Sequence, residues 1–84
     1  MDRFEHELVT LKNGKQYFVL ESIMHEYDIY NLVLNVEDEE DVKIVLQEVK
    51  NGKTIFSDVS DKEILKVVSP LFKNKIKEAQ KNIN

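Results

Sequence analysis

Two Asn-Gly pairs, Asn13-Gly14 and Asn51-Gly52, constrain the fold more than any other feature of this sequence. Each pair lies between two short runs in which apolar residues alternate with polar ones. Asparagine and glycine accept the positive φ angles that tight hairpin turns require. Each pair therefore predicts an antiparallel hairpin.

The alternating runs predict a sheet over residues 5–58, with a further turn at residues 25–28. Tyr30, Leu32 and Leu34 share one face of the third run, which we expect to be buried, while the opposite face is half solvated. The result is an antiparallel meander of about five strands. The expected strands are residues 5–11, 16–24, 29–36, 42–49 and 54–56.

An amphipathic helix is predicted over residues 61–80, with a frayed tail at 81–84. Ser60 and Glu63 have the spacing of a capping box, which marks a helix start. Pro70 lies inside the helix and lacks the amide that would bond to the carbonyl of Lys66, so the helix is either kinked or broken there. A single kinked helix is favoured because the apolar period continues without a phase change. The apolar stripe consists of Ile64, Val67, Val68, Leu71, Phe72 and Ile76.

Composition and length exclude several classes of protein. A chain of 84 residues is predicted to be one α+β domain, residues 1–84, with the helix packed on one sheet face. Cysteine is absent, which excludes disulfides and thiolate chemistry and suits a reducing cytoplasm. The longest apolar runs span only four residues, so neither secretion nor a membrane span is expected.

Charge is segregated along the chain. Residues 1–41 carry eleven acidic and three basic side chains, a net charge of −8, whereas residues 42–84 carry five acidic and nine basic ones, a net charge of +4. Five adjacent carboxylates repel one another and need water, so the acidic run is predicted to be a solvated loop and not a strand. This run consists of Glu37, Asp38, Glu39, Glu40 and Asp41.

No catalytic, cofactor or metal site is predicted. His6 and His25 have no ligand spacing, and no nucleophile elbow or glycine-rich phosphate loop is present. The lysines at the end of the helix are explained by its dipole, and the net charge of −4 disfavours direct nucleic-acid binding. The aromatic residues, Tyr17, Phe18, Tyr27 and Tyr30, are expected in the core or on strand faces, with partner anchoring as the alternative.

The order of segments resembles that of the YrzB-like proteins, short acidic proteins of unknown function from Firmicutes and their phages. The resemblance runs through the hairpin at residues 11–20, the strand at 30–34, the acidic run, the strand at 42–49 and the helix from Ser60. It implies a cytoplasmic protein without an assigned activity. The basic tail and Pro70 depart from the family pattern.

A shorter segment is similar to the first strand of the phage uracil-DNA glycosylase inhibitors, which are small acidic DNA mimics. The match covers Gly14-Lys15-Gln16 and, four residues further on, Glu21-Ser22-Ile23. This similarity implies that Glu21 and Ser22 contact an enzyme's DNA groove.

The sequence thus predicts a non-enzymatic module that binds another protein, with a DNA-mimic inhibitor as the alternative. The candidate contact residues are Glu21 and Ser22 together with the acidic run at residues 37–41. We expect a monomer or a weak homodimer, because an open edge on the first or fifth strand permits pairing with another chain.

Overall fold

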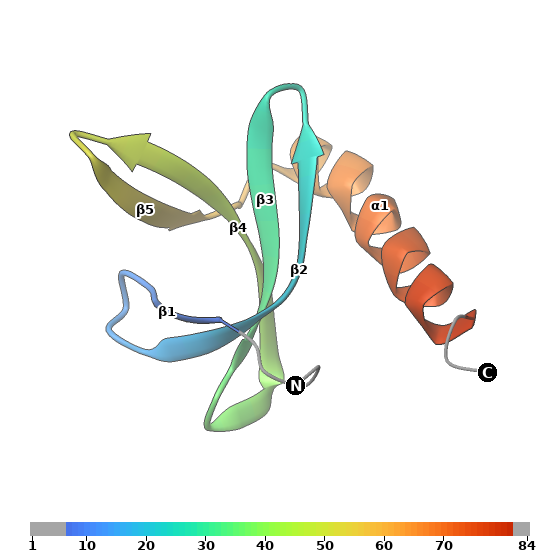
Figure 1. Cartoon of the computed structure of the whole chain (residues 1–84), viewed down its shortest axis with the longest axis horizontal. Helices are drawn as coiled ribbons and strands as arrows, with labels where there is room; N and C mark the ends of the chain where they lie inside the picture. Colours follow the sequence, from blue (N-terminus) through green and yellow to red (C-terminus); the bar gives the residue numbers. More distant parts are fainter. Residues whose placement is uncertain (1–6, 82–84) are drawn as a thin grey trace.

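A five-stranded antiparallel sheet and one C-terminal helix make up the protein, as the computed structural model shows for residues 7–81, with side chains described up to Glu78. The strands follow one another in chain order and curl into a half-barrel, and helix α1 lies beside β2 and β3 (Figure 1). The elements are β1 (Leu8–Thr10), β2 (Gln16–His25), β3 (Asp28–Asn35), β4 (Asp38–Lys50), β5 (Lys53–Asp58) and α1 (Lys62–Lys81).

The predicted α+β meander with a C-terminal helix is confirmed. The main difference is in β4, which begins at Asp38, four residues before the predicted start. The predicted beginning of the first strand at residues 5 and 6, and the predicted fraying at residues 82–84, lie outside the described residues.

Both Asn-Gly pairs form turns, but with different geometry. Asn51 and Gly52 both have positive φ, 52° and 77°, and make a two-residue turn between β4 and β5. At the first pair only Gly14 is left-handed, with φ 82°, and the Leu11 amide donates to the Lys15 carbonyl at 3.0 Å. The first turn therefore has a three-residue loop.

The turn between β2 and β3 has two positive-φ residues and no glycine. Glu26 has φ 50° and Tyr27 has φ 73°, a backbone conformation that is unfavourable for L residues with a side chain. His25 and Asp28 pair directly on either side of them. The turn predicted at residues 25–28 is confirmed, although its sequence carries strain that Asn-Gly would avoid.

Apolar clusters lie on both faces of β3, which corrects the prediction of a half-solvated face. Val33 is fully buried, and the neighbouring Asn31 and Asn35 are 2% and 7% exposed. The curl of the sheet causes this, because it brings β1 and β5 over the concave face. The concave cluster comprises Val9, Leu11, Tyr17, Val33 and Val45, with Val19 and Phe56 packed against it.

The second cluster joins the opposite face of the sheet to α1. Val68 and Phe72 of the helix are buried together with Tyr30 of β3. Ile23, Leu32, Ile44, Leu46, Val59 and Ile64 pack around them. Three residues of the predicted apolar stripe, Ile64, Val68 and Phe72, thus supply a core. The other three are exposed, which corrects the prediction of a continuous buried stripe: Val67 is 45%, Leu71 38% and Ile76 37% exposed.

Asp61 caps the helix, whereas the sequence predicted a capping box at Ser60. Asp61 Oδ1 accepts the Glu63 amide at 2.9 Å, and its main-chain carbonyl accepts the Leu65 amide at 3.0 Å. Aspartate is as good an N-cap as serine, and its negative charge also favours the helix N-terminus. Helix α1 continues through Pro70 as one element, and a bend of its axis there stays a prediction.

Within residues 7–81, no helix is long and apolar enough to cross a membrane.

Candidate functional site

Only Glu37 of the acidic run lies in a turn, and residues 38–41 belong to β4, which corrects the prediction that the whole run is a loop. Val36 and Glu37 form the turn after β3, and Asp38 already belongs to β4. Asn35 pairs with Asp38, while the preceding Leu34 pairs with Val42, so the three β4 residues between them have no partner on β3. The acidic run is therefore a bulged strand start.

Four carboxylates of this bulged segment stay in water. Glu37, Asp38, Glu39 and Glu40 are all exposed, so their repulsion is screened by solvent and an extended backbone is tolerated. We call these four residues the acidic patch. Two local hydrogen bonds fix its backbone, because the Glu37 amide donates to Asn35 Oδ1 at 2.8 Å and the Glu40 amide donates to Asp38 Oδ1 at 3.0 Å.

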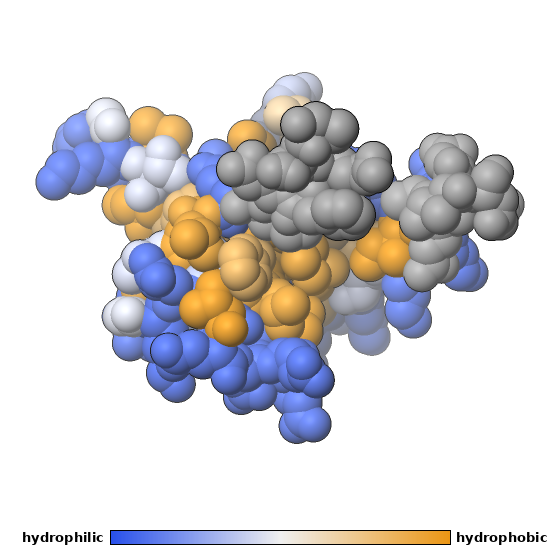
Figure 2. Space-filling model, turned by 60° about the horizontal axis from the view of Figure 1, so that its bottom comes forward, coloured by the Kyte–Doolittle hydropathy of each residue, from blue (hydrophilic) through white to orange (hydrophobic). Residues whose placement is uncertain are grey.

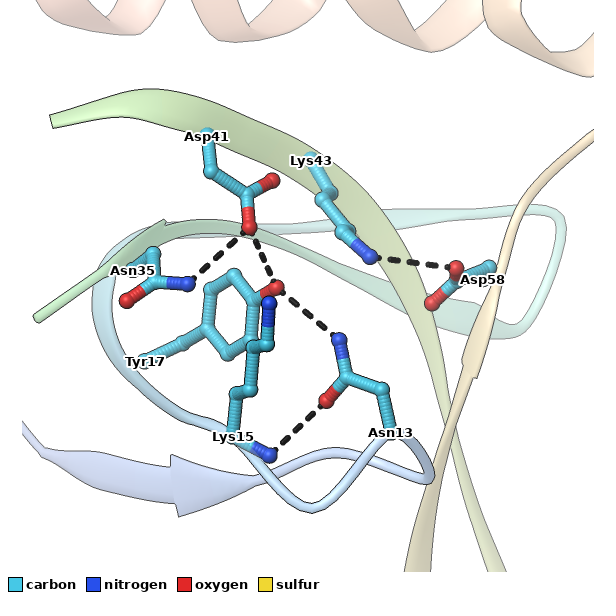
Figure 3. Close-up of polar contacts among 7 residues, drawn as sticks. All are labelled: Asn13, Lys15, Tyr17, Asn35, Asp41, Lys43 and Asp58. Atoms are coloured by element: carbon cyan, nitrogen blue, oxygen red, sulfur yellow. Dashed lines mark hydrogen bonds and ion pairs between the residues drawn. The ribbon is translucent and has the colours of Figure 1, made fainter. Parts of the chain in front are cut away.

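Asp41, the fifth carboxylate, points into the half-barrel (Figure 3). Its Oδ2 accepts a hydrogen bond from the Tyr17 hydroxyl at 2.6 Å and one from the Asn35 amide at 3.1 Å. Asn13 of the first turn donates to the same hydroxyl at 3.2 Å. These contacts join the first turn, β2, β3 and β4 at one point, so Asp41 anchors the acidic patch to the concave core.

The hydrogen bonds from Tyr17 and Asn35 lower the pKa of Asp41, because both favour the charged carboxylate. Lys43, two residues further along β4, lies with Nζ 5.5 Å from the centre of the Tyr17 ring and 3.4 Å from Asp58 Oδ2. The Asp41 carboxylate thus stabilises the fold, and the acidic patch beside it supplies the exposed charge.

A row of apolar side chains crosses four strands next to the acidic patch. Leu8, Phe18, Leu34 and Val42 are direct cross-strand neighbours, so they share one face of the sheet, and we call them the apolar row. Leu8 is 51% exposed and Val42 is 49% exposed, whereas the same face is buried further along β3 where α1 covers it.

The apolar row and the acidic patch adjoin one another around a shallow hollow of about 530 Å³. Figure 2 brings this side of the molecule forward and shows an apolar area bordered by hydrophilic residues. Apolar and charged contacts are therefore available side by side. The hollow is lined by Phe18, Leu34, Asn35, Val36 and the acidic patch.

Glu21 and Ser22 do not join this surface. They are consecutive in β2, so their side chains point to opposite faces of the sheet. Glu21 Oε1 lies 3.4 Å from Lys75 Nζ of α1, and the same ammonium group donates to the Ser22 carbonyl at 2.7 Å. The Ser22 hydroxyl donates to Asn31 Oδ1 on the other face. Both residues thus make polar contacts with other residues of this chain.

The aromatic residues divide between core and surface. Tyr17 and Tyr30 are buried, as expected for core packing, and Tyr27 is 97% exposed at the turn between β2 and β3. Within the described residues, no group of three or more His, Cys, Asp or Glu side chains is arranged to hold a metal ion.

Polar side chains lie inside the half-barrel, where none was predicted from the sequence. The Asn31 amide donates to Gln47 Oε1 at 2.8 Å, and Asn35 binds Asp41 as described above. One signal was present, because two asparagines at alternate positions of an apolar strand place two polar groups on one face. Their burial became visible only with the curl of the sheet.

Comparison with known proteins gives no relative: the chain matches no protein-family model, no curated protein and no solved structure.

Proposed function

We propose that this protein is a non-enzymatic interaction module that binds a basic segment of another protein through the acidic patch and the adjoining apolar row. The observation that carries the proposal is the exposure of four carboxylates on a backbone fixed by hydrogen bonds, around a hollow that Phe18 and Leu34 of the apolar row also line.

Each half of this surface has its own physical role. The four carboxylates attract lysine and arginine side chains over several ångströms, which speeds the encounter and selects the sign of the partner's charge. The apolar row supplies area that gains free energy when it is removed from water. A partner segment whose apolar side chains are flanked by basic residues can contact both the apolar row and the acidic patch.

Capture from a cell lysate tests the proposal. We compare the wild type with a variant that neutralises the acidic patch by Glu37→Gln, Asp38→Asn, Glu39→Gln and Glu40→Gln, and leave Asp41 intact because it holds the fold. The matched control neutralises four other exposed carboxylates, by Glu26→Gln, Asp28→Asn, Glu63→Gln and Glu78→Gln. Both variants change the net charge equally.

The expected result is a partner that elutes at high salt, is lost by the acidic-patch variant and is retained by the control. Equal capture by both variants would place the contact elsewhere. The module is expected to act in the cytoplasm, the compartment that suits a chain without cysteine.

A DNA-mimic inhibitor of a nucleic-acid enzyme is the second candidate, supported by the same four exposed carboxylates, three of which lie on the extended backbone of β4. An enzyme's DNA groove is itself a basic surface. Because Glu21 is paired with Lys75, we expect the acidic patch and not Glu21 to carry any inhibition. Inhibition of a DNA glycosylase or nuclease that is lost by the acidic-patch variant but kept by Glu21→Ala would favour this candidate over a peptide-binding module.

A further inference from the structure

The half-barrel is open along one seam, and both of its edge strands line the opening. β1 pairs only with β2, and β5 pairs only with β4, so each has one free edge within the described chain. Figure 1 shows the two strands on the same side of the molecule with a gap between them. A groove of about 600 Å³ occupies this gap. The seam groove is lined by residues 7–12 on one side and by Gln47, Thr54, Ile55 and Phe56 on the other.

The direction of the strands explains why the two edges do not close on each other. In an antiparallel meander every second strand runs the same way, so β1 and β5 are parallel to one another. Direct closure would join them as a parallel pair, which is slightly less stable per residue than an antiparallel one. A single strand that runs in the opposite direction can instead pair antiparallel with both.

The main-chain groups that face the groove follow from the hydrogen-bond pattern. On β1, the Val19 amide donates to the Glu7 carbonyl and the Leu11 amide donates to Lys15, so the alternate residues Leu8 and Thr10 direct their amides and carbonyls outward. This edge therefore offers main-chain donors and acceptors to the seam groove.

The same alternation applies to β5. The Val59 amide donates to the Ile44 carbonyl at 3.2 Å, and the two-residue turn pairs Lys50 with Lys53. Thr54 and Phe56, which alternate with the residues bonded to β4, therefore face the groove. Both walls of the groove carry strand edges that no other strand of residues 7–81 pairs with.

Apolar side chains form part of the inner side of the groove, next to Gln47 and Thr54. Val9 and Leu11 belong to the concave cluster, and Phe56 packs against it. A strand in the groove would place every second side chain on this apolar surface and the others in solvent. The occupant that fits is therefore extended and apolar at alternate positions.

We propose that the seam groove receives an extended segment of another polypeptide, which pairs with β1 and β5 and completes a six-stranded barrel. The occupant must have both of its edges free. The exposed strands of a second folded copy do not meet this condition, because β1 and β5 are each already paired on one side. Closure of a sheet into a barrel removes its open edges, which is the source of binding free energy here. The seam groove contains no residue of the acidic patch, although Leu8 of the apolar row also lines it.

Hydrogen exchange with a peptide probe tests the proposal. The probe is a synthetic copy of residues 42–50 of this chain, which carries Val42, Ile44 and Leu46 on one face and is the natural antiparallel neighbour of β5. On adding the peptide, we expect exchange at the amides of Leu8, Thr10, Thr54 and Phe56 to slow by about tenfold or more. The same peptide with proline at its fourth position is the inactive control, because proline lacks the main-chain N–H that a strand paired on both sides must donate.

Two protein variants make the result specific. Thr54→Pro removes an outward amide and leaves the pairing of β5 with β4 intact, so the fold is retained and peptide binding is lost. Thr54→Ala keeps the amide and is expected to bind like the wild type, and circular dichroism checks that both variants are folded.

Three results would overturn the proposal. They are equal exchange with the active and the proline-containing peptide, protection of the four amides without any peptide, and protection that rises with protein concentration alone. The second would mean that the chain itself fills the groove, and the third that a second copy does.

Discussion

At the scale of single residues, the acidic run divides into two roles that its composition does not distinguish. Asp41 accepts hydrogen bonds from Tyr17 and Asn35 inside the half-barrel, while the four carboxylates before it face water. The sequence shows five equivalent acids. Tyr17 of β2 pairs with Asn35 of β3. This pairing brings the Tyr17 hydroxyl and the Asn35 amide to Asp41, the carboxylate that turns inward.

The lowered pKa of Asp41 makes stability depend on pH. Because the folded-state pKa lies below the unfolded-state value, ionised Asp41 stabilises the protein above the unfolded pKa, and this contribution is lost as pH falls through the folded pKa. Asp41→Asn keeps an acceptor for Tyr17 without the charge. We expect the variant to lose less stability than the wild type between about pH 6 and pH 2, measured by urea unfolding. Parallel curves for the two proteins would show that Asp41 does not couple to folding.

A substitution at Asn31 tests how much the buried polar contacts contribute to stability. Its side chain is 2% exposed and bonds to both Ser22 and Gln47. Asn31→Ala leaves those groups without their partner and should lower the free energy of unfolding by about 1–3 kcal/mol. Asn74→Ala, at an exposed position of α1, is the control and should change it little. Similar values for both variants would mean that water replaces the Asn31 contacts.

At the scale of elements, local signals predicted the strands and the helix, and the errors came from long-range contacts. The Asn51-Gly52 turn depends only on its own φ preferences and was predicted from two residues. Repulsion within the acidic run predicts a loop, but the Tyr17 hydroxyl holds Asp41 inward, and β4 is therefore longer than predicted. The curl of the sheet, and with it the burial of Asn31 and Asn35, depends on strands that are distant in sequence and could not be predicted.

The strained turn between β2 and β3 offers a direct stability test. Tyr27 has φ 73° and is almost fully exposed, so its side chain contributes little packing. Tyr27→Gly should raise the free energy of unfolding by about 0.5–1 kcal/mol, because glycine adopts this conformation without a steric penalty. Tyr27→Ala retains the penalty and serves as the control. If both variants unfold at the same urea concentration, backbone strain is not what limits this turn.

Pro70 provides the corresponding test in α1. The helix continues through this exposed position although proline cannot donate to the Lys66 carbonyl. Pro70→Ala restores that donor and a better helix former, so we expect a gain of about 1–3 kcal/mol in urea unfolding. A loss of stability would instead show that the fold needs a bend at this residue.

At the scale of the whole molecule, the charged surfaces and the seam groove lie at different places on the protein. The acidic patch and the apolar row adjoin at the β3–β4 end, the lysine-bearing helix lies beside β2 and β3, and the seam groove opens between β1 and β5 (Figures 1 and 2). The charge segregation was evident from the sequence. The position of the acidic patch next to the apolar row was not evident, because the row is assembled from four strands. It consists of Leu8, Phe18, Leu34 and Val42.

The most direct test of the binding surface is a residue-by-residue NMR titration of the protein with a synthetic amphipathic peptide that carries lysines around leucine anchors. We expect chemical-shift changes at Phe18, Leu34 and residues 36–42, which weaken with added salt and disappear in the variant with a neutralised acidic patch. Changes confined to α1, or equal changes in the variant, would contradict this expectation.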